Sequence, residues 1–275
     1  MIALTSGILA VLLYLTGTLL QKQVLGNSVP ARTEPKARDG SKRILLLAVI
    51  ALVIHMVNVL QIVNTASGYD FGFFKIATLF SWVMVLIVVI SSIKLPLQNL
   101  FLVLFPLAII SILCSVLMPS QATPLTDITG GVALHIALGI LAFSVITIAA
   151  VQAMLVAWLS RELKHHHFNS VLRHLPPLQT LEVLLFDFIK AGFLMLVGVI
   201  ASGFMFMEDM FAQHLVHKTV LTMVSTCVFG GLLWGRHAQG WRGKTALRWT
   251  LSGFAVLILA YFGSKFVLEL LLHRT

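Results

Sequence analysis

Three histidines, His55, His135 and His217, lie in or beside long apolar segments of the sequence. Placing an imidazole in hydrocarbon costs free energy, so an ionisable side chain at membrane depth indicates a functional site. Histidine is also a common protein ligand of metals and of haem iron. The three residues therefore predict a cofactor site, with haem b as the leading candidate and His135 and His217 as its proposed axial ligands.

The composition predicts an all-α polytopic membrane protein. Hydrophobic residues make up 59% of the 275 residues, charged residues make up 11%, and the mean hydropathy is +0.98. Soluble domains carry roughly 25% charged residues. A helix that crosses the bilayer needs about 20 apolar residues, and helices satisfy their own backbone hydrogen bonds in lipid. Residues 1–275 are expected to form a single integral membrane domain with eight transmembrane helices: 2–20, 44–64, 72–93, 97–118, 130–159, 183–205, 217–236 and 246–272.

The first segment is expected to remain as a membrane helix. Residues 1–20 have no basic region at their start, and no small-residue cleavage site precedes the polar stretch that follows. A cleaved signal peptide typically has both a basic region and a small-residue cleavage site. Their absence favours a retained helix.

The basic residues predict how the helices are oriented. Loops 21–43, 94–96, 160–182 and 236–248 hold 14 of the 19 lysines and arginines, whereas the intervening loops hold none. Cytoplasmic loops of membrane proteins carry an excess of Lys and Arg. The four basic loops are therefore predicted to be cytoplasmic, and both termini extracytoplasmic, in a multi-pass protein of the bacterial inner membrane.

This topology places the three histidines between mid-membrane and the extracytoplasmic side. His135 and His217 lie at similar depths, near the outer ends of two helices. Gly131 and Gly139 flank His135 on its own helix face and leave room for a large flat ligand. Each histidine also has an alternative to haem binding. His135 could only form a hydrogen bond to a neighbouring helix, and His217 could simply be solvated at the start of its helix.

Three further residues are candidates for the same site. His55 lies near the middle of its segment and shares a helix face with Asn58, so it is either a second haem-binding position or one half of a structural pair. Lys218 and Lys265 are candidates to form an ion pair with an anionic ligand group such as a haem propionate. Lys265 has the alternative of extending its ammonium to the membrane surface.

A copper-handling or small-solute transporter is the main alternative function. Met205, Met207 and Met210 precede His214 and His217 at the outer side. Thioether and imidazole groups are ligands that suit copper(I). A purely structural role, in which the histidines only connect helices, is the other alternative.

Other function classes are disfavoured by what the sequence lacks. No nucleophile–base arrangement, phosphate-binding loop or pair of catalytic carboxylates is present, which predicts a protein that is not an enzyme. The net charge of +9 resembles that of nucleic-acid-binding proteins, but its basic residues follow the alternate-loop pattern of membrane topology. The expected partners are therefore haem and the lipid bilayer, with no nucleic acid.

Several motifs resemble the bacterial cytochrome c assembly family of haem-handling membrane proteins (CcsA, CcmC and HemX type), and within it the YpjD-type inner membrane proteins. The resemblance spans most of the chain and is densest after residue 130. It rests on the segment Gly131–Ala157, Pro176-Pro177-Leu178 with Leu181-Glu182, His217-Lys218-Thr219, Trp234-Gly235-Arg236, Gly240-Trp241-Arg242-Gly243, and Leu259-Ala260-Tyr261-Phe262-Gly263-Ser264-Lys265.

The resemblance implies an integral haem-binding protein that acts in cytochrome c assembly or haem homeostasis, with maturation proteins or apocytochrome as partners. In assembly members, two outer histidines flank a tryptophan-rich WWD loop and bind haem before its delivery. His135 and His217 match that pair, and His55 matches an intramembrane histidine. The WWD loop is absent here, because loop 206–216 contains no tryptophan. An accessory role, or a HemX-like role in regulating haem biosynthesis, is therefore expected.

Overall fold

The computed structural model describes residues 2–26, 35–118, 124–126, 128–165, 175–206, 216–263 and 266. Within these ranges eight helices are long and apolar enough to cross a membrane, and each corresponds to one predicted segment. This confirms the all-α architecture, and the orientation of the two termini stays a prediction. The helices are α1 (Ile2–Gly26), α2 (Pro35–Val63), α3 (Phe73–Ser91), α4 (Phe101–Leu117, after the short 3-10 helix η1, Gln98–Leu100), α5 (Gly130–Lys164), α7 (Leu178–Phe206), α8 (Val216–Gln239) and α9 (Gly243–Ile258).

The chain divides into two compact units, which are described separately. Unit 1 consists of residues Met1–Pro124 and Glu162–Pro177, and unit 2 of Leu125–Arg161 and Leu178–Thr275. The prediction of one integral membrane domain stays a prediction.

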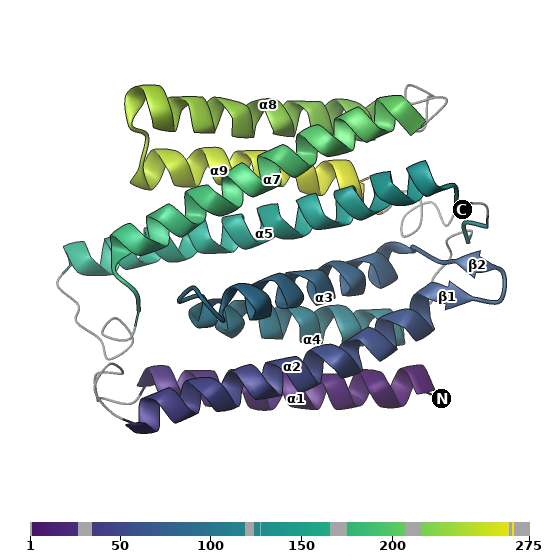
Figure 1. The fold of residues 1–275 in the computed structure, drawn as a ribbon, viewed down its shortest axis with the longest axis horizontal. Coiled ribbons are helices and arrows are strands. Elements are labelled where there is room, and N and C mark those ends of the chain that lie inside the picture. Colours follow the sequence, from purple (N-terminus) through teal and green to yellow (C-terminus); the bar gives the residue numbers. More distant parts are fainter. Residues whose placement is uncertain are drawn as a thin grey trace. The chain divides into compact units, whose positions relative to one another are not determined.

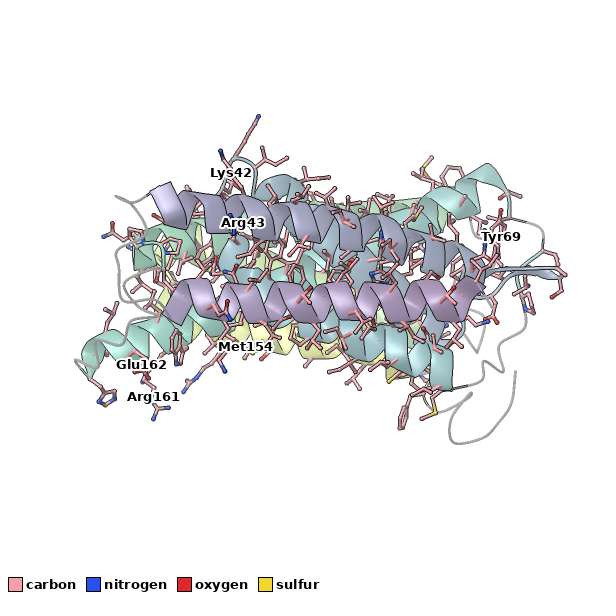
Figure 2. All side chains as sticks on the ribbon, turned by 90° about the horizontal axis from the view of Figure 1, so that it is seen from below. Lys42, Arg43, Tyr69, Met154, Arg161 and Glu162 are labelled. Atoms are coloured by element: carbon pink, nitrogen blue, oxygen red, sulfur yellow. The ribbon has the colours of Figure 1, made fainter. Side chains whose placement is uncertain are left out.

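Unit 1 is built from the first four long helices. α1 packs against α2 and α4, and α3 packs against the same two helices. A short hairpin connects α2 to α3: β1 (Asn64–Thr65) pairs antiparallel with β2 (Gly68–Tyr69). Figure 2 shows Lys42 and Arg43 at one end of unit 1 and Tyr69 at the opposite end. Unit 1 therefore has a basic end and a hairpin end.

Unit 2 contains α5, α7, α8 and α9. Gly192 of α7 lies close to α5: an added Cβ would lie 2.4 Å from Ile146 Cδ1, so a bulkier residue would require the Ile146 side chain to move. Small residues allow helices to approach closely in this way. The start of α5, the end of α7 and the start of α8 lie at the same end of unit 2 (Figure 1). The last predicted segment is less regular than expected, since α9 continues into a π-helix, η2 (Leu259–Gly263).

Candidate functional site

His135 is held by a hydrogen bond from the neighbouring helix. Its side chain is half-buried on α5, and its Nδ1 lies 3.1 Å from Ser202 Oγ on α7. The Ser202 hydroxyl donates its hydrogen to the Val199 carbonyl oxygen at 3.1 Å. A hydroxyl has a single hydrogen, so when Ser202 gives it to Val199, the donor in the Ser202–His135 pair is His135 Nδ1–H. In that tautomer His135 Nε2 carries the lone pair that a metal would bind.

Aromatic side chains lie against the two glycines that flank His135. A Cβ on Gly131 would lie 2.4 Å from Phe206 Cδ1, and a Cβ on Gly139 would lie 2.7 Å from the Tyr261 hydroxyl oxygen. The room predicted beside His135 is therefore filled by rings from α7 and η2. Phe206 is the last residue of α7 and is 40% exposed, so its ring is the one that a ligand at His135 displaces most readily.

His217 lies in the first turn of α8 and is exposed. The start of α8, which carries His217, and the start of α5, whose second turn carries His135, lie at the same end of unit 2 (Figure 1). Among the described residues, no cluster of three or more His, Cys, Asp or Glu side chains is arranged for a metal ion. Lys218, the next residue, is half-buried, and its carbonyl oxygen accepts a hydrogen bond from Thr222 at 2.7 Å.

Several predicted residues lie outside the described ranges. Lys265 is among them, and so are Met207, Met210 and His214 of the copper alternative. Met205 is described, and its side chain is 74% exposed. The copper and Lys265 predictions therefore stay predictions.

His55 belongs to unit 1, where it is fully buried. Its Nδ1 lies 3.1 Å from the Tyr14 hydroxyl oxygen, while the Asn58 amide donates to the Ala3 carbonyl oxygen at 2.7 Å. The structural pair of His55 with Asn58 does not form, because each residue has a partner on α1 instead. His55 Nε2 has no hydrogen-bond partner among the described residues. Such an orphaned buried nitrogen costs free energy.

Sequence reasoning missed the residues that hold these histidines. Tyr14 lies 41 positions before His55, and Ser202 lies 67 positions after His135. The signal for Tyr14 was present, because a tyrosine in an apolar segment requires a hydrogen-bond partner. Ser202 gave no such signal, since a serine in a membrane helix commonly bonds its own backbone.

A second cluster forms at the turn between α8 and α9. Arg242 donates two hydrogen bonds to Glu182 Oε2 of α7, at 2.8 Å from Nε and 2.6 Å from Nη2. The Arg236 guanidinium lies 4.5 Å from the centre of the Phe186 ring and donates to the Trp241 carbonyl oxygen at 3.2 Å. These contacts join the Leu181-Glu182, Trp234-Gly235-Arg236 and Gly240-Trp241-Arg242-Gly243 motifs in one place.

The chain matches known proteins over most of its length. The family model described as "Cytochrome C assembly protein" matches residues 44–272. The chain is 28% identical to "Inner membrane protein YpjD" of Escherichia coli K12 over 237 residues, which cover 84% of this chain and 89% of that protein. It is 32% identical to "Uncharacterized 28.8 kDa protein in nifR3-like 5'region" of Azospirillum brasilense over 160 residues, or 56% and 59% of the two chains. No solved structure matches the chain significantly.

The comparisons confirm the predicted localisation. A relative that matches most of the chain is an inner membrane protein, and eight helices of the described residues are long and apolar enough to cross a membrane. The chain is a multi-pass inner membrane protein.

Proposed function

The chain belongs to the cytochrome c assembly protein family, and from that premise we propose that it binds haem b near the extracytoplasmic surface and hands it on. The proposed role is in cytochrome c assembly or in haem homeostasis. Haem is the cargo in this proposal: the protein binds and releases it without altering it chemically. Proteins of this family are generally not classic enzymes, which agrees with such a role.

The donor set of unit 2 fits haem iron, and one observation carries the proposal. His135 Nδ1 lies 3.1 Å from the Ser202 hydroxyl oxygen, and with Nδ1–H as the donor, Nε2 would be the nitrogen that binds iron, as in metal-binding histidines. His217, exposed at the same end of unit 2, is the proposed second axial ligand. Haem supplies the iron that two neutral imidazoles bind.

The other candidates have supporting roles in the proposal. Lys218 and Lys265 are proposed to pair with the haem propionates, since an ammonium and a carboxylate form a strong charge-assisted hydrogen bond. His55, whose Nε2 lacks a partner among the described residues, is proposed as a second haem-binding position in unit 1. The absence of tryptophan from residues 206–216 favours an accessory or regulatory role over direct delivery to apocytochrome.

The absorption spectrum of the purified protein tests the proposal. The full chain is expressed with haem supplied, purified in mild detergent and measured in the oxidised and dithionite-reduced states. A sharp reduced Soret band with an α band supports a bis-histidine haem. A stable protein that never acquires haem contradicts the proposal.

Replacing Ser202 with alanine is expected to weaken haem binding about tenfold or more without abolishing it. The variant removes the group that orients the His135 ring but leaves the ligating nitrogen. Haem titration followed by absorbance measures the change, and Ser202→Thr, which keeps a hydroxyl, is expected to retain most of the affinity. A loss of thermal stability with unchanged affinity and spectrum would assign Ser202 a structural role only.

Acid is expected to release the haem. The ligating imidazole is neutral, and because free imidazole has a pKa of about 6.5, protons compete with iron as the pH falls below that value. Haem retained through gel filtration at pH 7.5 is therefore expected to be lost at about pH 4.5. Circular dichroism at both pH values controls for unfolding. Full retention at the lower pH in a folded protein contradicts ligation by exposed histidines.

A further inference from the structure

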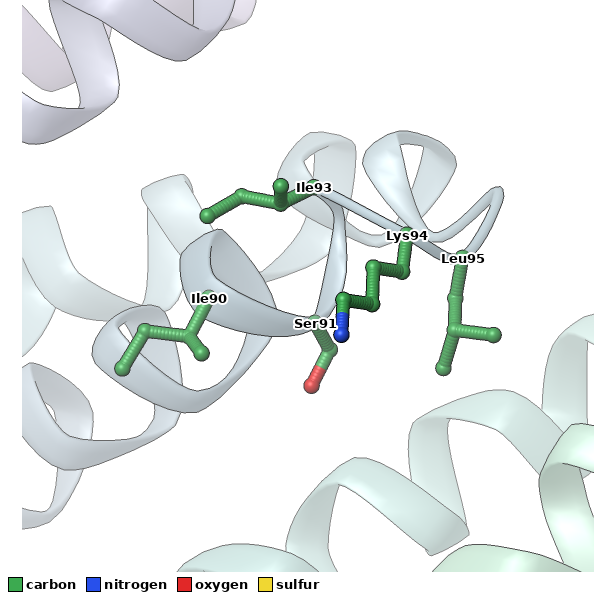
Figure 3. A pocket seen from close by; sticks show the side chains of 5 residues that line it. All are labelled: Ile90, Ser91, Ile93, Lys94 and Leu95. Carbon is green, nitrogen blue, oxygen red and sulfur yellow. The ribbon is translucent and has the colours of Figure 1, made fainter.

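A hollow of about 400 Å³ lies at the turn between α3 and η1 in unit 1. It is lined by Ile90, Ser91, Ile93, Lys94 and Leu95. Figure 3 shows the Lys94 nitrogen and the Ser91 oxygen on the same side of the turn, with Ile90 and Leu95 on either side of them. One cation and one hydroxyl therefore face a space whose other walls are aliphatic.

The turn that forms this hollow is fixed by its backbone. The Ser91 carbonyl oxygen accepts hydrogen bonds from the backbone N–H groups of Lys94 at 3.2 Å and Leu95 at 2.8 Å. Pro96 follows, and it prevents the helix from continuing because it has no N–H to donate. The backbone that carries the lining residues is thus fixed before any ligand arrives, which lowers the entropic cost of binding.

The chemistry of the hollow favours an amphiphile with a negative head. Ile93 is 69% exposed and Ile90 is 58% exposed, so a large aliphatic surface is available beside the lysine. A phosphate group accepts hydrogen bonds from ammonium and hydroxyl groups, while an acyl chain covers isoleucine and leucine.

Further positive charge lies at the same end of unit 1. The Ser41 hydroxyl of α2 donates a hydrogen bond to the Gln98 side-chain oxygen of η1, just after the turn. The next two residues of α2, Lys42 and Arg43, are both exposed. Basic residues at a membrane surface attract anionic lipids. A zwitterionic lipid gains much less from such a group of charges.

We propose that the hollow at Ile90–Leu95 binds an anionic phospholipid, with its phosphate on Lys94 and Ser91 and an acyl chain on Ile90, Ile93 and Leu95. The site does not depend on the haem proposal, since it lies in unit 1 and uses none of the histidines. In the predicted topology, the lipid belongs to the cytoplasmic leaflet, where the basic loops lie.

Native mass spectrometry of the full chain tests this site. The protein in mild detergent is titrated with palmitoyl-oleoyl phosphatidylglycerol or, for comparison, with palmitoyl-oleoyl phosphatidylcholine. We expect preferential retention of phosphatidylglycerol, reduced about fivefold by Lys94→Gln, because one lysine near a membrane surface contributes roughly that factor. Lys94→Arg is expected to restore binding, and Ile93→Ser to weaken it while the cation remains.

Lys244→Gln is the matched control, because it removes an exposed lysine from a different basic loop. Unchanged phosphatidylglycerol binding in Lys94→Gln, or an equal loss in Lys244→Gln, would overturn the proposal. Equal retention of the two lipids would do the same. Displacement of the lipid by inorganic phosphate alone would assign the site to free phosphate and overturn the lipid assignment.

Discussion

Replacing His135 with alanine is expected to abolish the haem spectrum of the purified protein. The variant removes the proposed ligand, whereas Ser202→Ala removes only its support, so the loss of affinity should exceed about a hundredfold. His135 is half-buried, and its loss removes one hydrogen bond to Ser202, so the protein is expected to fold. The sharp reduced Soret and α bands are expected to disappear although haem is supplied during expression.

Three further variants locate the haem. His217→Ala is expected to convert the spectrum to that of a protein with a single axial histidine, or to remove it. His237→Ala is the matched control, because His237 is an exposed histidine near the opposite end of the same helix. A spectrum lost in His55→Ala but unchanged in His135→Ala would move the haem to unit 1. An unchanged spectrum in all four variants would exclude His55, His135 and His217 as haem ligands.

The existence of the helices could be predicted from hydrophobicity, but their ends depend on tertiary partners. The sequence predicts a start at residue 183 for the helix that begins at Leu178. Judged from the sequence alone, the carboxylate at residue 182 places the N-terminal boundary of the apolar segment just after it. In the structure Glu182 is inside α7, because Arg242 neutralises it across 60 positions of sequence. Such a pairing has no local signature.

The candidate ligands can be identified in the sequence, but the side chains that surround them cannot. A histidine in an apolar segment is visible in the sequence, and so is the similar depth of His135 and His217. The packing between helices determines that Phe206 fills the space beside Gly131 and that Tyr14 bonds His55. Small residues in a helix predict that another helix or side chain packs closely there, but they do not identify which one.

Gly235→Ala is expected to produce the largest loss of stability outside the candidate site. Gly235 is buried near the end of α8, and an added Cβ would lie 2.3 Å from Trp241 Cε3 and 2.4 Å from Trp241 Cδ2. The indole has little freedom to move, because its Nε1 donates to Gln239 Oε1 at 2.8 Å and its ring lies 4.9 Å from that of Trp249. Overpacking of this kind costs about 1–3 kcal/mol.

The displaced indole should also disturb the contacts that join the turn to α7. Trp241 precedes Arg242, whose guanidinium binds Glu182, and Arg236 donates to the Trp241 carbonyl oxygen. A thermal midpoint lowered by about 5 °C, measured in detergent by circular dichroism, is the expected result. Gly198→Ala is the matched control in α7, since its Cβ would meet Leu138 Cδ1 at 3.6 Å, an ordinary van der Waals distance.

A double-mutant cycle separates steric conflict from a general effect of alanine. In a Trp241→Ala background the ring is gone, so Gly235→Ala should cost little or even stabilise the protein, because alanine favours helix more than glycine does. An equal cost in both backgrounds would contradict the steric explanation. The cycle therefore tests whether the glycine of the Trp234-Gly235-Arg236 motif is required because an indole from the Gly240-Trp241-Arg242-Gly243 motif packs on it. Through that packing the two motifs form one structural element, and this element holds the α8–α9 turn on α7.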